Sequence, residues 1–128
     1  MAKQMTPPER MAALFMGEKP DRVPVNPFVE GYLEWRGRYF WLFGPETPIA
    51  DQIKAFGAHD VICGNVDPPS FQTKSYKQCL ELCRENIEAG KDSPNGFVLA
   101  AGCEFPPKAP PINLMAMVDA AEMFGRYE

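Results

Sequence analysis

Apolar positions in the second half of the chain follow two alternating patterns. Apolar residues recur at helical spacing near residues 47–57, 75–90 and 114–125. Two short apolar runs, 60–63 and 97–101, lie between these segments and are typical of buried strands. This α-β-α-β-α order predicts parallel strands that are joined by right-handed crossovers.

Local signals mark the predicted helix boundaries. Thr6 and Glu9 fit a capping box at the start of an N-terminal helix, and Ser75 and Gln78 fit a second one. Glycines at the ends of the helical patterns are expected to terminate the helices, at Gly17, Gly57, Gly90 and Gly125. Residues 64–69, rich in Gly, Asn, Asp and Pro, are predicted to form a loop after the first buried strand.

The first half of the chain is less regular. Residues 23–28 contain two prolines, which predicts a short extended segment or an edge strand. Aromatic residues crowd positions 29–44 without a clean period. Residues 39–43 fit either a buried strand or a short helix, and periodicity does not decide between them.

These elements predict the fold class. A complete (β/α)₈ barrel needs roughly 200 residues or more, and the chain has 128. We therefore expect an α/β protein, an incomplete (β/α)₈ TIM-barrel fragment with about three to four parallel strands and flanking helices. It is expected to be a single truncated domain over 1–128, with a helix, a strand and the aromatic segment in 1–43 and the βα units in 44–128.

Composition narrows the function classes. The net charge is −4 and the basic residues are scattered, which argues against a nucleic-acid partner. No stretch approaches the roughly 20 apolar residues of a membrane span, and the N-terminus lacks a signal-peptide core, so we expect a cytoplasmic protein without a membrane partner. The four cysteines are then expected to be free thiols or ligands rather than disulfides.

Candidate chemistry lies where the two buried strands end, since parallel α/β folds place their sites there. Gly64 lets the backbone turn or a ligand approach. Asn65 and Asp67 are candidates for binding a polar small-molecule substrate or accepting a proton. The alternative is an Asx turn, in which these side chains only hold their own backbone.

Cysteines provide the candidate metal ligands. Cys103 follows the second strand and is either a thiolate ligand, a nucleophile or a small buried thiol. Cys63 is its better partner, because both residues end strands that are expected to be neighbours. His59 does not pair with Cys63 on one zinc, since four strand residues separate them by about 13 Å. Cys79 and Cys83 share an apolar helix face and are assigned to the core.

Arginines provide the candidate anion-binding groups. Arg36 and Arg38 lie among aromatic residues and either bind a carboxylate ligand or stack on nearby rings at the surface.

Three segments of the sequence resemble the uroporphyrinogen decarboxylase superfamily. They are the opening segment from Thr6 to Val25, the Gly64-Asn65-Val66-Asp67-Pro68 segment, and the stretch from Gly96 through Gly102-Cys103-Glu104 to Leu114. The resemblance covers about residues 6–28 and 46–127 and leaves out the middle of the family's (β/α)₈ barrel.

The resemblance implies two activities. One branch of the family decarboxylates uroporphyrinogen in haem synthesis without a cofactor. The other transfers methyl groups to or from corrinoid proteins, using zinc bound by a His-x-Cys pair and a later cysteine. That later cysteine falls on Cys103, and the glycine-cysteine turn favours the methyltransferase-like branch. The His-x-Cys pair itself has no counterpart here.

Three hypotheses follow from the residues and the resemblance. In the first, the protein is methyltransferase-like, Cys103 and Cys63 bind zinc, a corrinoid is the substrate, and a corrinoid protein or a second copy of the chain completes the site. In the second, a decarboxylase-type enzyme binds an acidic substrate through Arg22, Arg36 and Arg38. In the third, the chain is a non-catalytic fragment that serves as a pairing module or has no role. Because the middle of the barrel is missing, activity of this chain is expected to be lost or to depend on a partner.

Overall fold

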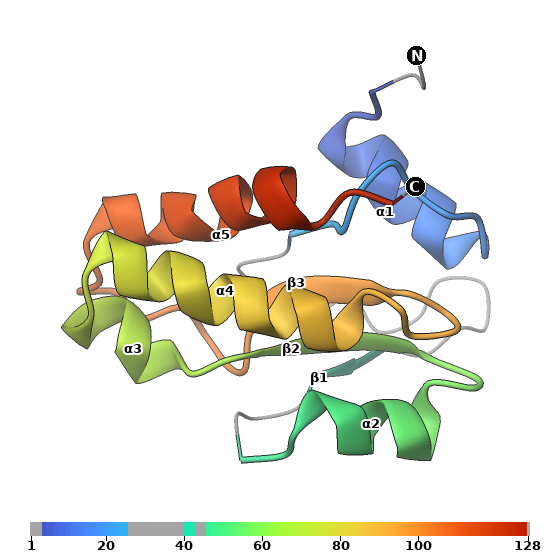
Figure 1. The fold of residues 1–128 in the computed structure, drawn as a ribbon, viewed down its shortest axis with the longest axis horizontal. Coiled ribbons are helices and arrows are strands. Elements are labelled where there is room, and N and C mark those ends of the chain that lie inside the picture. Colours follow the sequence, from blue (N-terminus) through green and yellow to red (C-terminus); the bar gives the residue numbers. More distant parts are fainter. Residues whose placement is uncertain (1–3, 26–39, 43–45, 128) are drawn as a thin grey trace.

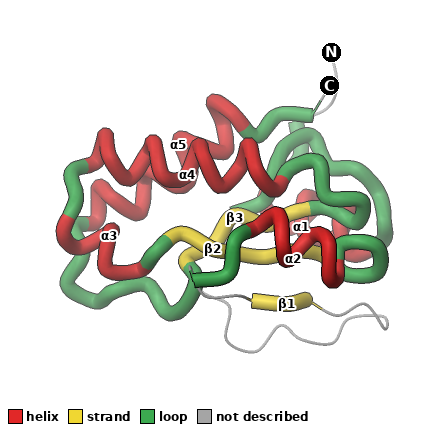
Figure 2. Tube along the Cα trace, turned by 60° about the horizontal axis from the view of Figure 1, so that its bottom comes forward, coloured by secondary structure: helices red, strands yellow, loops and turns green. Residues whose placement is uncertain are grey.

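The computed structural model describes residues 4–25, 40–42 and 46–127 (Figure 1). A parallel sheet of three strands in the order β1-β2-β3 lies at its centre. The elements in chain order are α1 (Pro7–Phe15), β1 (Phe40–Leu42), α2 (Ile49–Phe56), β2 (Val61–Val66), α3 (Pro68–Thr73), α4 (Tyr76–Gly90), β3 (Phe97–Ala101) and α5 (Pro111–Phe124). Figure 2 shows β1 at one edge of the sheet, with β2 and β3 between it and the layer of α4 and α5.

A fourth extended segment joins the sheet beside β3. Val25 forms a parallel bridge with Leu99, whose N–H donates to the Pro24 carbonyl at 3.0 Å. The order across the sheet is therefore 23–25, β3, β2, β1, which confirms the predicted three to four parallel strands. The ambiguous stretch 39–43 contains strand β1.

One boundary prediction was wrong. Residues 64–66 were expected in a loop, but they belong to β2, because Gly64, Asn65 and Val66 pair with residues 99–101 of β3. The turn-forming composition was outweighed by the buried partner strand. The loop prediction also missed helix α3, which starts directly after Asp67.

Side chains alternate between two faces of the sheet. One face packs against α4 and α5 and carries the larger cluster, which includes Ile62, Val66, Phe97, Leu99, Ile87 and Met117. The other face contacts α1 through a smaller cluster of Leu14, Phe15, Val61, Cys63, Val98 and Ala100. The helices that follow β2 and β3 therefore cover the same side of the sheet, as parallel crossovers require.

The C-terminal segment covers part of the edge that residues 21–25 form. The Val23 N–H donates to the Gly125 carbonyl at 2.8 Å, and the Tyr127 N–H donates to the Asp21 carbonyl at 3.2 Å. Arg22 and Arg126 form an antiparallel bridge there. Figure 1 shows the C-terminus beside the α1 end of the molecule.

Capping boxes fix the first turns of α1 and α4. Both predicted capping boxes are present, between Thr6 and Glu9 for α1 and between Ser75 and Gln78 for α4.

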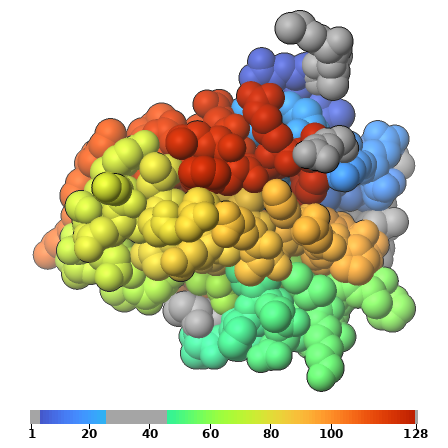
Figure 3. All heavy atoms as spheres, viewed as in Figure 1, coloured from blue at the N-terminus to red at the C-terminus, as the bar shows by residue number. Residues whose placement is uncertain are grey.

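Figure 3 shows α4 and α5 lying side by side across one face of the molecule. Over the described residues, no helix has the length and apolarity that a membrane crossing requires.

Candidate functional site

The carboxyl ends of β2 and β3 lie side by side. The Gly102 N–H donates to the Val66 carbonyl at 2.9 Å, so the register continues one residue past β3. Asp67 follows Val66 and Cys103 follows Gly102. Two of the predicted site residues therefore leave adjacent strands at the edge of the sheet where α/β enzymes bind their ligands.

Asp67 caps helix α3. Its Oδ2 accepts hydrogen bonds from the Ser70 N–H at 3.1 Å and from the Ser70 hydroxyl at 2.7 Å. Among the described residues, no hydrogen bond reaches Oδ1 of this half-buried carboxylate. The capping interaction that the sequence left open as an alternative is present, and it leaves one carboxylate oxygen for a ligand.

Asn65 connects three elements from inside the sheet. Its side-chain amide donates to the Thr47 carbonyl at 2.7 Å, and its backbone N–H donates to Asn86 Oδ1 at 3.0 Å. The side-chain amide of Gln52, in α2, donates to the same Thr47 carbonyl at 2.7 Å. These bonds tie β2 to α4 and to the residues that precede α2. Gly64, just before Asn65, has a φ of 141°, a backbone conformation that favours glycine.

The two candidate metal ligands are not brought together. Cys63 is opposite Val98 in the strand register. The strand from Val98 to Ala101 is about 10 Å long, and Cys103 lies beyond its end, so the two cysteines are at different heights along the sheet. One zinc bound to two thiolates spans at most about 4.6 Å between the sulfurs. Complete burial also raises the pKa of the Cys63 thiol, which disfavours a thiolate.

Cys103 is the one exposed cysteine of the four. Within the described ranges, no group of three or more His, Cys, Asp or Glu residues is arranged to bind a metal ion. The described donors therefore do not fit a complete zinc site, since Cys103 is a single accessible thiol and catalytic zinc needs three protein ligands.

Arg22, the candidate arginine that lies within the described residues, is not at this edge. Val25 is opposite Leu99, so Arg22 lies at the amino end of the strands, away from Asp67 and Cys103. It forms an ion pair with Glu122 of α5 at 3.1 Å. Arg36 and Arg38 lie outside the described residues.

Sequence reasoning missed three residues that shape this edge. Ser70, three positions after Asp67, completes the cap, and this spacing is itself a capping signal. Asn86 carried no local signal, because its role depends on how α4 packs on β2. Phe105 packs its ring against Phe71 with the ring centroids 4.9 Å apart, which holds the loop after Cys103 against α3.

Comparison with known proteins agrees with this architecture. A family model, "Uroporphyrinogen decarboxylase (URO-D)", matches residues 39–124. The solved structure of a methyltransferase from Methanosarcina mazei superposes with a TM-score of 0.58 at 18% sequence identity, over 94% of this chain and 38% of that one. No curated protein matches the chain.

The parallel sheet and its flanking helices define an α/β protein of the TIM-barrel class. The family match covers most of the chain, so the chain belongs to the URO-D family. It spans 38% of the length of the methyltransferase that it resembles. The parallel strands 23–25, β3, β2 and β1 therefore form part of a (β/α)₈ barrel, which has eight strands when complete.

Proposed function

We propose that this chain is a methyltransferase-like member of the URO-D family whose ligand binds at the carboxyl ends of β2 and β3. The observation that carries the proposal is the hydrogen bond between Gly102 and Val66, which sets the carboxylate of Asp67 one residue beyond β2 and the exposed thiol of Cys103 two residues beyond β3. The fold neighbour, which is a methyltransferase, and the position of Cys103 in the family pattern support the same branch.

Cys103, Asp67 and Asn65 have distinct roles in the proposal. Cys103, exposed after a rigid strand, is the thiol that meets the ligand, since a thiolate acts as a nucleophile or as a metal ligand. Asp67 offers Oδ1 to a donor group of the ligand, while its Oδ2 is held by Ser70. Asn65 positions the strand end through its bonds to Thr47 and Asn86 and does not contact the ligand itself.

Activity in this proposal depends on a partner. A closed barrel surrounds its site with strand ends from all sides, whereas this chain provides the ends of neighbouring strands on one side. A second copy of the chain or a corrinoid protein would supply the facing wall. Zinc, which the methyltransferase branch uses, would also require ligands from outside the described residues, because those present do not complete its coordination.

The test starts with metal binding and molar mass. The purified chain is loaded with zinc and dialysed, and bound zinc is measured by elemental mass spectrometry beside light scattering of the same sample. The proposal predicts zinc only in an assembly larger than one chain, and its loss in Cys103→Ala. Cys83→Ala is the matched control, because Cys83 is a buried thiol of α4 and should keep the metal.

Methyl transfer is then measured from methylcobalamin to a small thiol. Turnover by the assembly, its loss in Cys103→Ala and a decrease in Asp67→Asn would support the proposal. Zinc that persists in Cys103→Ala would show that this cysteine is not a ligand. A monomer that binds neither zinc nor methylcobalamin would favour the non-catalytic reading.

A further inference from the structure

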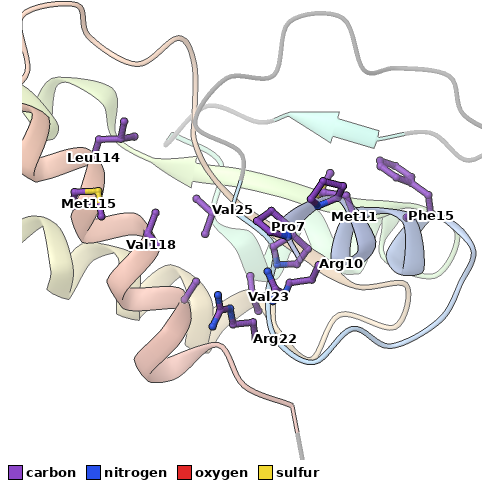
Figure 4. Close-up of a pocket in the computed structure, with 14 residues that line it drawn as sticks. Pro7, Arg10, Met11, Phe15, Arg22, Val23, Val25, Leu114, Met115 and Val118 are labelled. Atoms are coloured by element: carbon purple, nitrogen blue, oxygen red, sulfur yellow. The ribbon is translucent and has the colours of Figure 1, made fainter. Parts of the chain in front are cut away.

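A second candidate site lies away from the strand ends, in a groove between α1 and α5. Figure 4 shows α1 on one side, α5 on the other, and Val23 and Val25 between them. The groove has a volume of about 720 Å³, which is within the roughly 300–1,000 Å³ of small-molecule sites. Its apolar walls include Met11 and Phe15 of α1 and Leu114, Met115 and Val118 of α5.

Apolar side chains of the groove are left accessible by the fold. Met115 is 46% exposed and Val118 is 36% exposed. Met11, Val25 and Leu114 are half-buried. A continuous apolar surface of this kind, formed by two helices and an edge segment, is a feature of ligand grooves and interfaces.

The charged residues among the described groove lining are both arginines, Arg10 and Arg22. Arg10 is buried, and its guanidinium group donates hydrogen bonds to both carboxylate oxygens of Asp21 and to the Met5 carbonyl, so it is not available to a ligand. Arg22 is also largely buried, with 12% of its side chain exposed, but the side chain of its partner Glu122 is 49% exposed. Its ion pair therefore has one solvated partner that a ligand can displace.

We propose that this groove binds a small apolar carboxylate, with its hydrocarbon part between α1 and α5 and its carboxylate on Arg22. Charge complementarity carries the choice, since the guanidinium group of Arg22, whose partner Glu122 is solvent-exposed, can bind a carboxylate in a bidentate way. A cation would find no carboxylate among the described lining residues, and a neutral apolar molecule would leave Arg22 paired with Glu122. The site is independent of the proposed methyltransferase function, because Arg22 lies at the amino end of the strands.

The proposal predicts a defined order among probe ligands. Hexanoate, octanoate and decanoate are titrated into the full chain below their micelle concentrations, and binding is followed by NMR chemical shifts and calorimetry. Each added methylene should tighten binding roughly fourfold while the groove is filling. Octanol and octylamine, with the same chain length, should bind at least about tenfold more weakly than octanoate, because hydrogen bonds to charged groups contribute the difference.

Three variants test the roles of the residues. Arg22→Gln should weaken octanoate about tenfold or more and leave octanol unchanged. Glu122→Gln should strengthen octanoate several-fold, since it removes the competing carboxylate. Val118→Trp should block all three ligands. Arg84→Gln is the matched control, because Arg84 is an ion-paired arginine of α4 outside the groove, and it should change nothing.

Several results would overturn the proposal. Equal affinity for octanoate, octanol and octylamine would show that Arg22 does not select the ligand. If Arg22→Gln proves unstable, Glu122→Gln provides the same test, because it lies at an exposed position and should fold normally. Unchanged octanoate binding in Glu122→Gln would also show that Arg22 does not select the ligand. A dimer that Val118→Trp converts to a monomer would assign the groove to a second copy of the chain instead.

Discussion

The side-chain amide of Asn113 donates a hydrogen bond of 2.8 Å to the main-chain carbonyl of Phe71. The same amide donates to the Lys74 carbonyl at 2.9 Å. Asn113 lies at the start of α5 and is 1% exposed, while its two acceptors belong to the end of α3. One buried amide therefore joins two helices that are about forty residues apart in sequence and closes the end of α3.

We predict that Asn113→Ala lowers the free energy of unfolding by about 2 kcal/mol, because the Phe71 and Lys74 carbonyls lose a shared donor. Urea denaturation followed by circular dichroism measures the change. Ile112→Ala is the control at the neighbouring position, where the side chain is 56% exposed, and it should change stability by no more than about 0.5 kcal/mol. Equal effects of the two substitutions would contradict the role of the buried amide.

Acid stability should depend on the ion pair between Arg10 and Asp21. The hydrogen bond from the Arg10 guanidinium, 2.5 Å from Asp21 Oδ1, lowers the pKa of the Asp21 carboxyl below its usual value. A carboxyl with a lowered folded pKa stabilises the fold above its unfolded pKa, near 3.9, and this stability is lost as the pH falls through the folded pKa.

Asp21→Asn should therefore cost about 3 kcal/mol at pH 7, because it leaves the buried Arg10 without its partner. It should also flatten the loss of stability below about pH 4. Urea midpoints measured between pH 2.5 and 7 test both effects, with the exposed Glu85→Gln as control. An unchanged acid profile in Asp21→Asn would mean that another carboxylate dominates.

Local signals predicted much of the fold. Both capping boxes, at Thr6 and Ser75, start their helices as expected, since capping depends on residues three positions apart. The buried run 97–101 is a strand, and α/β alternation gave the parallel sheet. These features were predictable because their causes lie within a few residues of the chain.

Features that depend on tertiary contacts were not predictable in the same way. The end of β2 was misplaced because Gly64, Asn65 and Val66 resemble a turn until β3 pairs with them. The buried face of α5 was not predictable either, because α5 is apolar on several sides and leaves Val118 exposed. At the candidate site, Asp67 and Cys103 were predicted to follow neighbouring strands, and they do, whereas the separation of Cys63 from Cys103 required the strand register.

Thiol reactivity should separate Cys103 from the other three cysteines. Cys103 is exposed, whereas Cys63, Cys79 and Cys83 are buried. Burial raises the pKa of all three buried thiols, that of Cys83 to about 12. At pH 7.5 an aromatic disulfide reagent should therefore modify one thiol quickly and the other three only after urea is added.

Cys103→Ala should abolish the fast phase without changing the number of thiols released by urea. Absorbance at neutral pH measures both amplitudes. Two or more fast thiols in the native protein would show that the core around β2 and α4 opens readily, contrary to the packing of Cys63 and Cys83.

Replacing the glycine at the end of α4 with alanine should destabilise the fold, which is the opposite of the usual effect of this substitution in a helix. Replacing a glycine in a helix with alanine normally stabilises by about 0.5–1 kcal/mol. At Gly90, however, an added Cβ would lie 2.5–2.6 Å from three ring atoms of Phe97, which is fully buried. We therefore predict that Gly90→Ala destabilises the fold by about 2 kcal/mol, as overpacking does.

A double-mutant cycle with Phe97→Leu tests the cause. The smaller side chain makes room at the contact, so Gly90→Ala should cost clearly less in the Phe97→Leu background than in the wild type, with a coupling of at least about 1 kcal/mol. Urea denaturation of the four proteins gives the coupling directly. If the two substitutions prove additive, the loss in Gly90→Ala arises from the end of α4 itself and not from its contact with β3.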